Sequence, residues 1–392
     1  MQKVNTIITS HRQKPRPIIK WTGGKYDEFP IFAKYIPPFN NYYEPFFGGG
    51  GVFFALQPKA ISFINDKSAD LINFYRSLHS KEFETELFLY ADAWDKAGEF
   101  ASFLTDVLIQ PFKTFVENKI SGDKITDIIT EFIEDIDTKK FNPLFDHDFI
   151  LSASAFKKAL ADSLKDKFSR IKKICIKEAR IFNHDELADH IETGAKSGLY
   201  LYLREVMNDH AFGRITLSTA KATANWYFVR EFCYASMFRY NSKGGFNIPY
   251  GGIAYNRKNF RQKAENIFSK TVKQLFCRTQ MYNMDFQQFL ETTNPQKDDF
   301  IFVDPPYDSD FSEYDQNSFT KKDQQRLRDV LFSAKAKWML VIKGTKFIHD
   351  LYKHGQCSII EFDKTYTYNV RGRNNRDTQH LIIVNYAIDE AV

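Results

Sequence analysis

The chain has 392 residues, of which 43% are hydrophobic and 26% are charged. This length suits one large α/β domain with an insertion or two ordinary domains, and this composition excludes a disordered protein. The formal net charge of +5 permits a locally basic face but does not by itself indicate nucleic acid.

Membrane and metal functions find no support in the residue pattern. No run of about 18 apolar, uncharged residues is present, and the first residues lack the apolar region of a secretory signal, so we expect a cytoplasmic protein. The cysteines are far apart and lack metal-ligand spacing, so we expect core residues, no disulfide and no metal site. They are Cys175, Cys233, Cys277 and Cys357.

Strand and helix patterns alternate near the N-terminus, where β-type runs at 42–46 and 60–65 are followed by a helical pattern at 69–78. From about 81 to 187 the pattern is that of charged amphipathic helices, for example at 155–181. The glycines and proline of 238–252 predict a loop or hairpin.

Strand patterns return in the C-terminal part. They lie at 275–282, 300–303, 338–342, 358–362 and 380–386, with helical patterns at 321–336 and 347–353. Strands alternating with helices in both flanks predict one parallel α/β sheet interrupted by an insertion. We predict a domain made of 1–80 and 265–392, with 81–264 inserted.

The most specific motif is Asp304-Pro305-Pro306-Tyr307, directly after the buried strand Phe300–Val303. Side chains at the carboxyl end of a parallel strand face the crevice in which α/β proteins bind ligands. A planar aromatic amine is a poor nucleophile, and Asp304 together with the Pro305 carbonyl can accept its two hydrogens. Tyr307 offers a ring face on which a base can stack. The motif therefore predicts an amine clamp.

Two glycine-rich turns accompany this motif. Glu44-Pro45-Phe46 leads into four glycines, and Asp66 follows the next strand, at the spacing of a carboxylate that binds ribose hydroxyls. Lys20-Trp21-Thr22-Gly23-Gly24-Lys25 is another tight turn that offers a cation and an indole. The pattern favours a nucleoside cofactor.

In this order the blocks resemble the DNA adenine methylase family, the D12 or alpha class of amino-methyltransferases. The family order is KW-x-GGK, EPF-x-G-x-G, a recognition region and DPPY. This chain has KWTGGK at 20–25, EPFFGGG at 44–50, IND at 64–66, RYNSKGGFNIPYG at 239–251 and DPPY at 304–307. The resemblance implies a Rossmann-like class I methyltransferase sheet with an inserted, mainly helical target-recognition domain.

The resemblance also implies site residues and partners. S-adenosylmethionine is the implied cofactor, and double-stranded DNA with a flipped adenine, methylated at N6, is the implied substrate. Cofactor contacts are implied for Trp21, Lys25, Phe46, Gly48, Gly50, Asp66, Asp285 and Asp304. Catalytic roles are implied for Asp304, Pro305, Pro306 and Tyr307. DNA contacts are implied for Tyr234, Arg239, Asn241 and Lys243, with Tyr234 entering the duplex and Arg239 reading a base.

One block departs from the family pattern. Tyr234-Ala235-Ser236 stands where the family has an aromatic residue followed by Asn-Gly. The site GATC, the commonest in the family, is therefore a guess for this chain. A restriction-modification, orphan or phage role, a cognate restriction endonuclease, and a monomer or weak dimer are all compatible with the sequence.

Other functions stay open on the residues alone. The same clamp can methylate cytosine N4, an RNA adenine or a protein glutamine amide. A DNA-binding protein without catalysis would lose the clamp or the cofactor turn, and a proline-motif adaptor would not bury its motif behind a strand. The arginines of 368–376 can contact phosphates or lie in a solvated loop.

Overall fold

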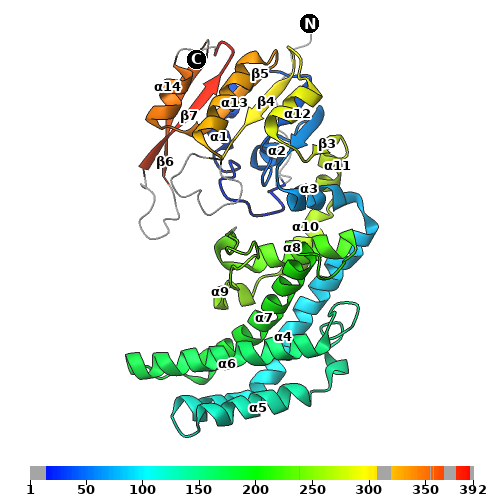
Figure 1. Ribbon diagram of the computed structural model, residues 1–392, viewed down its shortest axis with the longest axis vertical. Coiled ribbons are helices and arrows are strands. Elements are labelled where there is room, and N and C mark those ends of the chain that lie inside the picture. The colour runs from blue at the N-terminus through cyan, green and yellow to red at the C-terminus, as the bar shows by residue number, and fades with distance from the viewer. Residues whose placement is uncertain are drawn as a thin grey trace. The chain divides into compact units, whose positions relative to one another are not determined.

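The computed structural model describes residues 15–237, 239–306, 319–353, 355, 357–365 and 377–388 (Figure 1). The chain divides into two compact units. The sheet unit contains Met1–Ser68, Lys270–Ser309 and Phe319–Val392, and the helical unit contains Ala69–Ser269. The segment after Ser68 belongs to the helical unit because Phe74 stacks on Tyr227 at a centroid distance of 5.0 Å.

Among the residues that the structure describes, seven strands form one sheet in the order β3-β2-β1-β4-β5-β7-β6. Their bounds are β1 Asn41–Glu44, β2 Ile61–Asn65, β3 Thr279–Tyr282, β4 Phe300–Val303, β5 Lys337–Lys343, β6 Ser358–Thr365 and β7 Asp377–Val384. Strands β1 to β5 are parallel to one another, which confirms a Rossmann-like α/β sheet. In the chain, the helical unit lies between β2 and β3.

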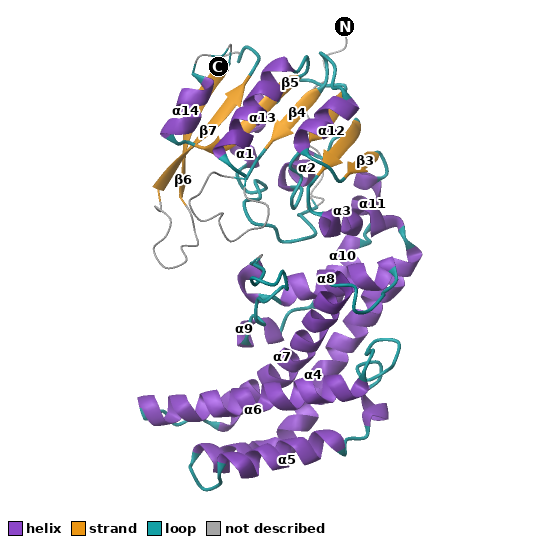
Figure 2. Cartoon of the chain, viewed as in Figure 1, coloured by secondary structure: helices purple, strands orange, loops and turns teal. Residues whose placement is uncertain are grey.

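Helices cover both faces of the sheet. The helices of the sheet unit are α1 Phe29–Phe32, α2 Gly51–Leu56, α11 Lys270–Phe276, α12 Phe286–Thr293, α13 Lys321–Ser333 and α14 Lys346–Tyr352, with a 3₁₀ turn η1 at Ala33–Tyr35. One face packs Ile301, Val303 and Leu340 against α12, α13 and α14 (Figure 2). Phe302 points to the other face, where it stacks on Phe32 of α1. This alternation follows from the period of two in a strand.

The expectation of an all-parallel sheet is wrong at one edge, because β7 runs antiparallel to both β5 and β6. Eleven residues separate β6 from β7. A parallel crossover needs a dozen or more residues, whereas an antiparallel return does not. The predicted strand at 275–282 is also shorter, because its first residues complete α11, whose Phe276 packs on Phe53 of α2.

The helical unit consists of long and short helices, with longer connections at 135–152 and 233–252 (Figure 1). Its elements are α3 Ala69–Arg76, η2 Ser77–His79, α4 Lys81–Val116, α5 Gly122–Glu134, η3 Thr138–Phe141, α6 Ala153–Glu178, α7 His184–Ala211, α8 Thr219–Phe232, η4 Tyr234–Ser236, α9 Ile253–Asn256 and α10 Phe260–Ile267. Ser80, Ser152 and Asn183 cap α4, α6 and α7 with their side-chain oxygens. No helix in the described part of the chain is long and apolar enough to cross a membrane.

Helix α7 is the centre of this unit and packs on α4, α6 and α8. Gly194 and Gly198 allow α6 to approach closely, since a Cβ atom at either position would lie 2.8 Å from an atom of Leu164 or Leu160. The C-terminal half of α7 supports the segment 233–252 instead. One helix therefore connects the outer pair of helices with the predicted recognition loop.

The cysteines differ in burial. Cys233 is buried, Cys175 and Cys357 are partly buried, and Cys277 is exposed. All four are free. The expectation of core residues is therefore wrong for Cys277, which begins the short turn between α11 and β3 at the surface.

Candidate active site of the sheet unit

The carboxylate that follows β4 is paired with a lysine of the N-terminal segment. Lys25 Nζ donates to Asp304 Oδ1 at 2.8 Å and Oδ2 at 3.0 Å, and to the Gly23 carbonyl at 2.8 Å. The Lys25 side chain is 1% exposed and the Asp304 side chain 18%. A shielded cation at this distance favours the ionised carboxylate, which only accepts hydrogen bonds.

The two prolines after Asp304 differ in their surroundings. Pro305 is buried and Pro306 is exposed. The buried Gln324 on α13 donates to the Pro306 carbonyl at 3.1 Å, while the Pro305 carbonyl has no partner within the described part of the chain. The Pro305 carbonyl, which directly follows Asp304, is therefore available among the described residues as the second acceptor of the clamp. Tyr307, the predicted stacking residue, lies outside the described residues.

The glycine turn after β1 closes against Trp21. Gly48 has φ +51°, and a Cβ atom there would lie 2.8 Å from Trp21 Cδ1. Gly50 has φ +67°, and its Cβ would lie 2.7 Å from the Phe47 ring. Both positions need glycine because the backbone is left-handed and the space is filled. The structure thus brings together Trp21, Gly48 and Gly50, as the motifs predict.

Asp66 is fixed at the same turn by main-chain donors. Its Oδ2 accepts from Gly48 N and its Oδ1 from Ser68 N, both at 2.9 Å. Burial raises the pKa of Asp66, and the backbone hydrogen bonds oppose that shift. The carboxylate therefore already orders the turn that the motif assigned to the cofactor.

Asn65, which the sequence analysis did not single out, joins three strand ends. Its Nδ2 donates to the carbonyls of Pro45 and Met284 at 3.0 and 3.1 Å, and its Oδ1 accepts from Met284 N at 3.0 Å. It is 1% exposed. An asparagine directly before Asp66 at the end of a buried strand was the available signal.

Asp285 caps α12 and forms a bidentate ion pair with Arg326 of α13, with both N–O distances at 2.9 Å. The Arg326 guanidinium also lies 4.4 Å from the centre of the Phe286 ring. Phe46 packs on Phe286 at 5.3 Å. The carboxylate of Asp285 is thus largely engaged within the protein, and a cofactor contact there has to share its acceptor sites with Arg326.

Glu44, at the end of β1, is a second carboxyl group that the motifs left without a role. It is 2% exposed and accepts from the Tyr42 hydroxyl at 2.7 Å. Burial raises the pKa of Glu44 well above its ordinary value, and the charges of Asp304 and Asp66 add to this rise. The protonated, neutral form of Glu44 is therefore favoured at the end of β1.

The four predicted DNA contacts all lie in the helical unit. Tyr234 is 47% exposed, and Arg239 and Lys243 are also exposed. Asn241 Oδ1 accepts from the main chains of Lys243 and Gly245, so this side chain shapes the turn. Ala235 and Ser236 have φ +53° and +52°.

Buried groups behind this loop hold it in place. Arg230 donates to the carbonyls of Ser236 and Met237 at 3.3 and 3.1 Å. Asn208 of α7 exchanges two hydrogen bonds with the main chain of Phe246. The exposed side chains of the loop therefore stand on a fixed backbone. The arginines of 371–376 lie outside the described residues.

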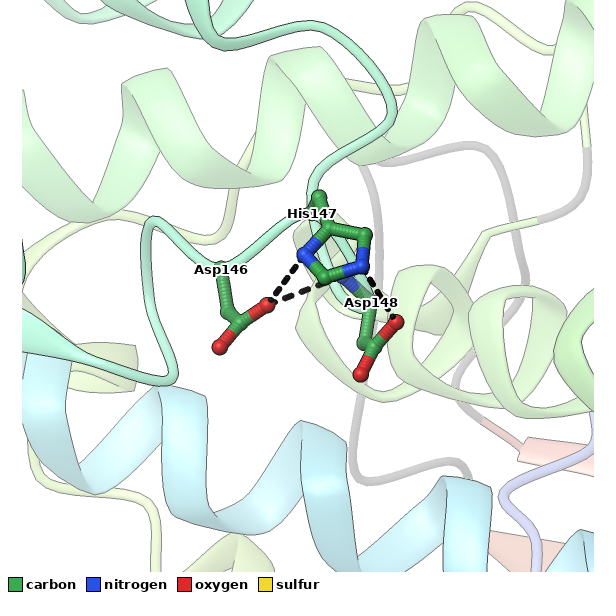
Figure 3. A group of neighbouring side chains, drawn as sticks. All are labelled: Asp146, His147 and Asp148. Atoms are coloured by element: carbon green, nitrogen blue, oxygen red, sulfur yellow. Dashed lines mark hydrogen bonds and ion pairs between the residues drawn. The ribbon is translucent and has the colours of Figure 1, made fainter.

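A possible metal-ligand group occurs elsewhere in the helical unit (Figure 3). His147 lies between Asp146 and Asp148, with ring nitrogens 2.9 and 3.1 Å from their carboxylates. Its side chain is 91% exposed. Three consecutive side chains, of which Asp146 is half-buried and the other two are exposed, do not by themselves define a metal site.

Comparison with known proteins identifies the chain. The sequence profile of the D12 class of N6 adenine-specific DNA methyltransferases matches residues 21–142 and 149–368. The chain belongs to this family. The family is that of DNA methyltransferases specific for N6 of adenine.

Relatives are found in bacteria and viruses. The chain is 35% identical to the type II methyltransferase M.CviBI of Paramecium bursaria Chlorella virus NC1A over 42% of its own length and 60% of that protein, less than two thirds. It is 22% identical to M1.LlaDCHI of Lactococcus lactis subsp. cremoris over 97% of its length and 99% of that protein. It is 26% identical to a DNA adenine methylase of Vibrio cholerae over 51% of its own length and 70% of that protein.

Proposed function

We propose that this D12 methyltransferase transfers a methyl group from S-adenosylmethionine to N6 of an adenine flipped out of double-stranded DNA. Methyltransferases of the family generally use this cofactor. The observation that carries the proposal is the shielded Lys25–Asp304 pair, followed in the chain by the Pro305 carbonyl, which has no hydrogen-bond partner among the described residues.

The clamp works through two acceptors. Asp304 accepts one amino hydrogen and the Pro305 carbonyl accepts the other, which directs the nitrogen lone pair out of the base plane. Lys25 orients Asp304 and keeps it an acceptor. The rigid geometry of the two prolines and the hydrogen bond from Gln324 to Pro306 hold the second acceptor. Tyr307 stays a prediction for stacking.

The cofactor fits the turn around Gly48. S-adenosylmethionine supplies an electrophilic methyl group on a sulfonium. The space of a side chain is filled by Trp21 at Gly48 and by Phe47 at Gly50, so the glycines bring the Trp21 indole against this turn, and we assign that indole to the cofactor. Asp66 retains acceptor sites for hydroxyl groups. We assign Phe46 and Asp285 to the same site.

The test uses Asp304→Asn, which keeps the shape of the side chain. We expect methyl transfer to fall by about 1,000-fold or more, because the charged acceptor and its pairing with Lys25 are lost. S-adenosylmethionine binding, measured by calorimetry, should persist in part, because Asp304 is only one of the assigned cofactor contacts, and would show a folded site. Wild-type activity in this variant would contradict the clamp.

The readout is sequencing of modified bases in DNA from a methylation-free host that expresses the chain. N6-methyladenine at one motif gives the target directly, and GATC is the first motif to examine. In the same assay Arg239→Ala should relax or weaken site selection, because a bidentate arginine contact contributes about 1–3 kcal/mol of discrimination. Arg239→Lys keeps the charge but not the fork, so it separates base reading from phosphate binding.

The biological setting follows from the same experiment. Two of the relatives are type II methyltransferases by name. We assign this chain to a restriction-modification, orphan or phage modification system, acting as a monomer or weak dimer. A cognate endonuclease would be expected to cut unmethylated DNA at the motif that the sequencing reveals.

A further inference from the structure

The second half of α6 carries much of the positive charge of the chain. Residues 165–180 contain seven basic and two acidic side chains, a surplus of five that equals the formal net charge of the whole protein. The basic residues are Lys165, Lys167, Arg170, Lys172, Lys173, Lys177 and Arg180. The formal charges of the rest of the chain therefore cancel, and the excess lies on the second half of α6 and the two residues that follow it.

Three of these residues form an exposed stripe, defined as Arg170, Lys173 and Lys177. Their spacing of three and four residues sets them on one side of α6, while Phe168 and Ile171 are buried on another. None of the three has an ion pair within the described residues. Asp166 is the acidic residue one turn before the stripe.

Other cations of this segment are engaged with neighbouring groups. Lys172 lies over the Phe115 ring, and Arg180 pairs with Glu186 of α7. Burial lowers the pKa of Lys167, and the charge of Arg170 lowers it further. The stripe is thus a set of free cations that repel one another, which a polyanion would relieve.

Helix α7 connects this surface rigidly with the predicted recognition loop. His190 lies in the part of α7 next to Lys167, and Asn208 holds Phe246 of the loop. The 18 residues between them span about 27 Å at 1.5 Å per residue. This length corresponds to about eight base pairs at 3.4 Å each. Helices α5 and α6 lie at the end of the unit away from α8 and α10 (Figure 1).

We propose that the stripe Arg170, Lys173 and Lys177 binds the phosphate backbone of DNA that flanks the methylation site. The inference rests on the proposed role of the loop at Tyr234 and Arg239 in DNA recognition. Such contacts carry no sequence information, but they raise affinity and give it a salt dependence. The helices of the insertion would thereby lengthen the DNA footprint of the enzyme.

The test compares the wild-type full chain with Arg170→Gln/Lys173→Gln/Lys177→Gln. Both proteins are assayed on two unmethylated duplexes that carry the target motif, of about 12 and about 36 base pairs. Each neutralised phosphate contributes about 0.9 to the slope of log affinity against log salt. The variant should lower that slope by up to about 2.7 on the long duplex. At 0.1 M salt its affinity for this duplex should fall by about 10-fold to 500-fold. Affinity for the short duplex and kcat should stay at wild-type values.

The matched control is Lys59→Gln/Lys297→Gln/Lys335→Gln, which removes the same charge from the sheet unit. These exposed lysines precede β2, β4 and β5, at the strand ends opposite Asp66 and Asp304. The control should bind both duplexes as the wild type does. An equal loss in both triple variants would reduce the effect to net charge and overturn the proposal.

Two further outcomes separate the proposals. Unchanged binding of the long duplex by the stripe variant would overturn the proposed phosphate contacts. The stripe, with the exposed Ile176 and Ile181 beside it, would then be a surface for a protein partner. Failure of the wild type to methylate either duplex would overturn the proposed function, while the binding comparison would still report on the stripe.

Discussion

Lys25 and Asp304 lie 279 positions apart in the chain, yet their side chains are hydrogen-bonded at 2.8 Å. The sequence motifs implied a cofactor contact for both residues and a catalytic role for Asp304, but not their pairing. Removing one member of a shielded ion pair leaves an uncompensated charge, at a typical cost of about 3–5 kcal/mol. Substitutions of Lys25 therefore affect Asp304 first, and any loss of cofactor binding has to be measured separately.

At the same scale, Glu44 predicts a pH dependence of stability. Its pKa is raised in the folded state above the ordinary 4.5, so the folded protein binds this proton more tightly than the unfolded chain does. The resulting stabilisation is present at low pH and is lost as the pH rises through the raised pKa. Glu44→Gln, which can still accept from Tyr42, removes this dependence.

We expect the free energy of unfolding of Glu44→Gln to exceed that of the wild type by an amount that grows with pH above 4.5. The growth is at most about 1.4 kcal/mol per pH unit. Urea denaturation of both proteins at several pH values between about 5 and 9 measures this difference in the free energy of unfolding. A constant difference across that range would mean that Glu44 is ionised throughout.

At the scale of elements, the glycines of α7 show packing overriding helix propensity. Gly198→Ala would gain about 1 kcal/mol of intrinsic propensity. Its new Cβ would lie 2.8 Å from the Leu160 Cα of α6, however, and a backbone atom cannot move aside. We expect a net loss of about 1–3 kcal/mol in chemical denaturation.

Gly98→Ala in α4 is the control, since the only atom near its Cβ is Lys196 Nζ at 3.9 Å. This variant should gain about 0.5–1 kcal/mol. Equal stability of the two variants would show that α6 and α7 do not pack as closely as described.

The loop after α8 is the other element in which backbone conformation matters. Ala235 and Ser236 occupy the left-handed region, which Asn and Gly adopt at lower cost. This chain adopts that conformation with neither Asn nor Gly at these two positions. The hydrogen bonds from Arg230 to Ser236 and Met237 stabilise that backbone.

At the scale of the whole molecule, the division into two units predicts which unit S-adenosylmethionine stabilises. A ligand that binds only the folded state adds about 2.7 kcal/mol at 100 times its Kd. We expect S-adenosylmethionine to slow hydrogen exchange in the sheet unit, at 19–26, 44–51 and 61–68. Asp66→Ala should remove this protection because Gly48 N and Ser68 N lose their acceptor. Protection confined to the helical unit would contradict the assigned site.

The sequence by itself determined the features that depend on local order. Strand β4 has the predicted bounds, and the blocks around Trp21, Gly48, Asp66 and Asp304 were sufficient to predict the α/β sheet and the family. These signals are legible because a strand repeats every two residues and because a left-handed turn or a clamp needs particular residue types.

Only the tertiary structure decided which side chains share partners. The pairing of Lys25 with Asp304 and of Asp285 with Arg326, the three-way link at Asn65 and the antiparallel course of β7 all depend on contacts between distant segments. No local pattern encodes such contacts, since they follow from the order in which strands assemble and from the space left between helices. The charge surplus of α6 was present in the sequence, but its exposure and its link to the recognition loop through α7 required the fold.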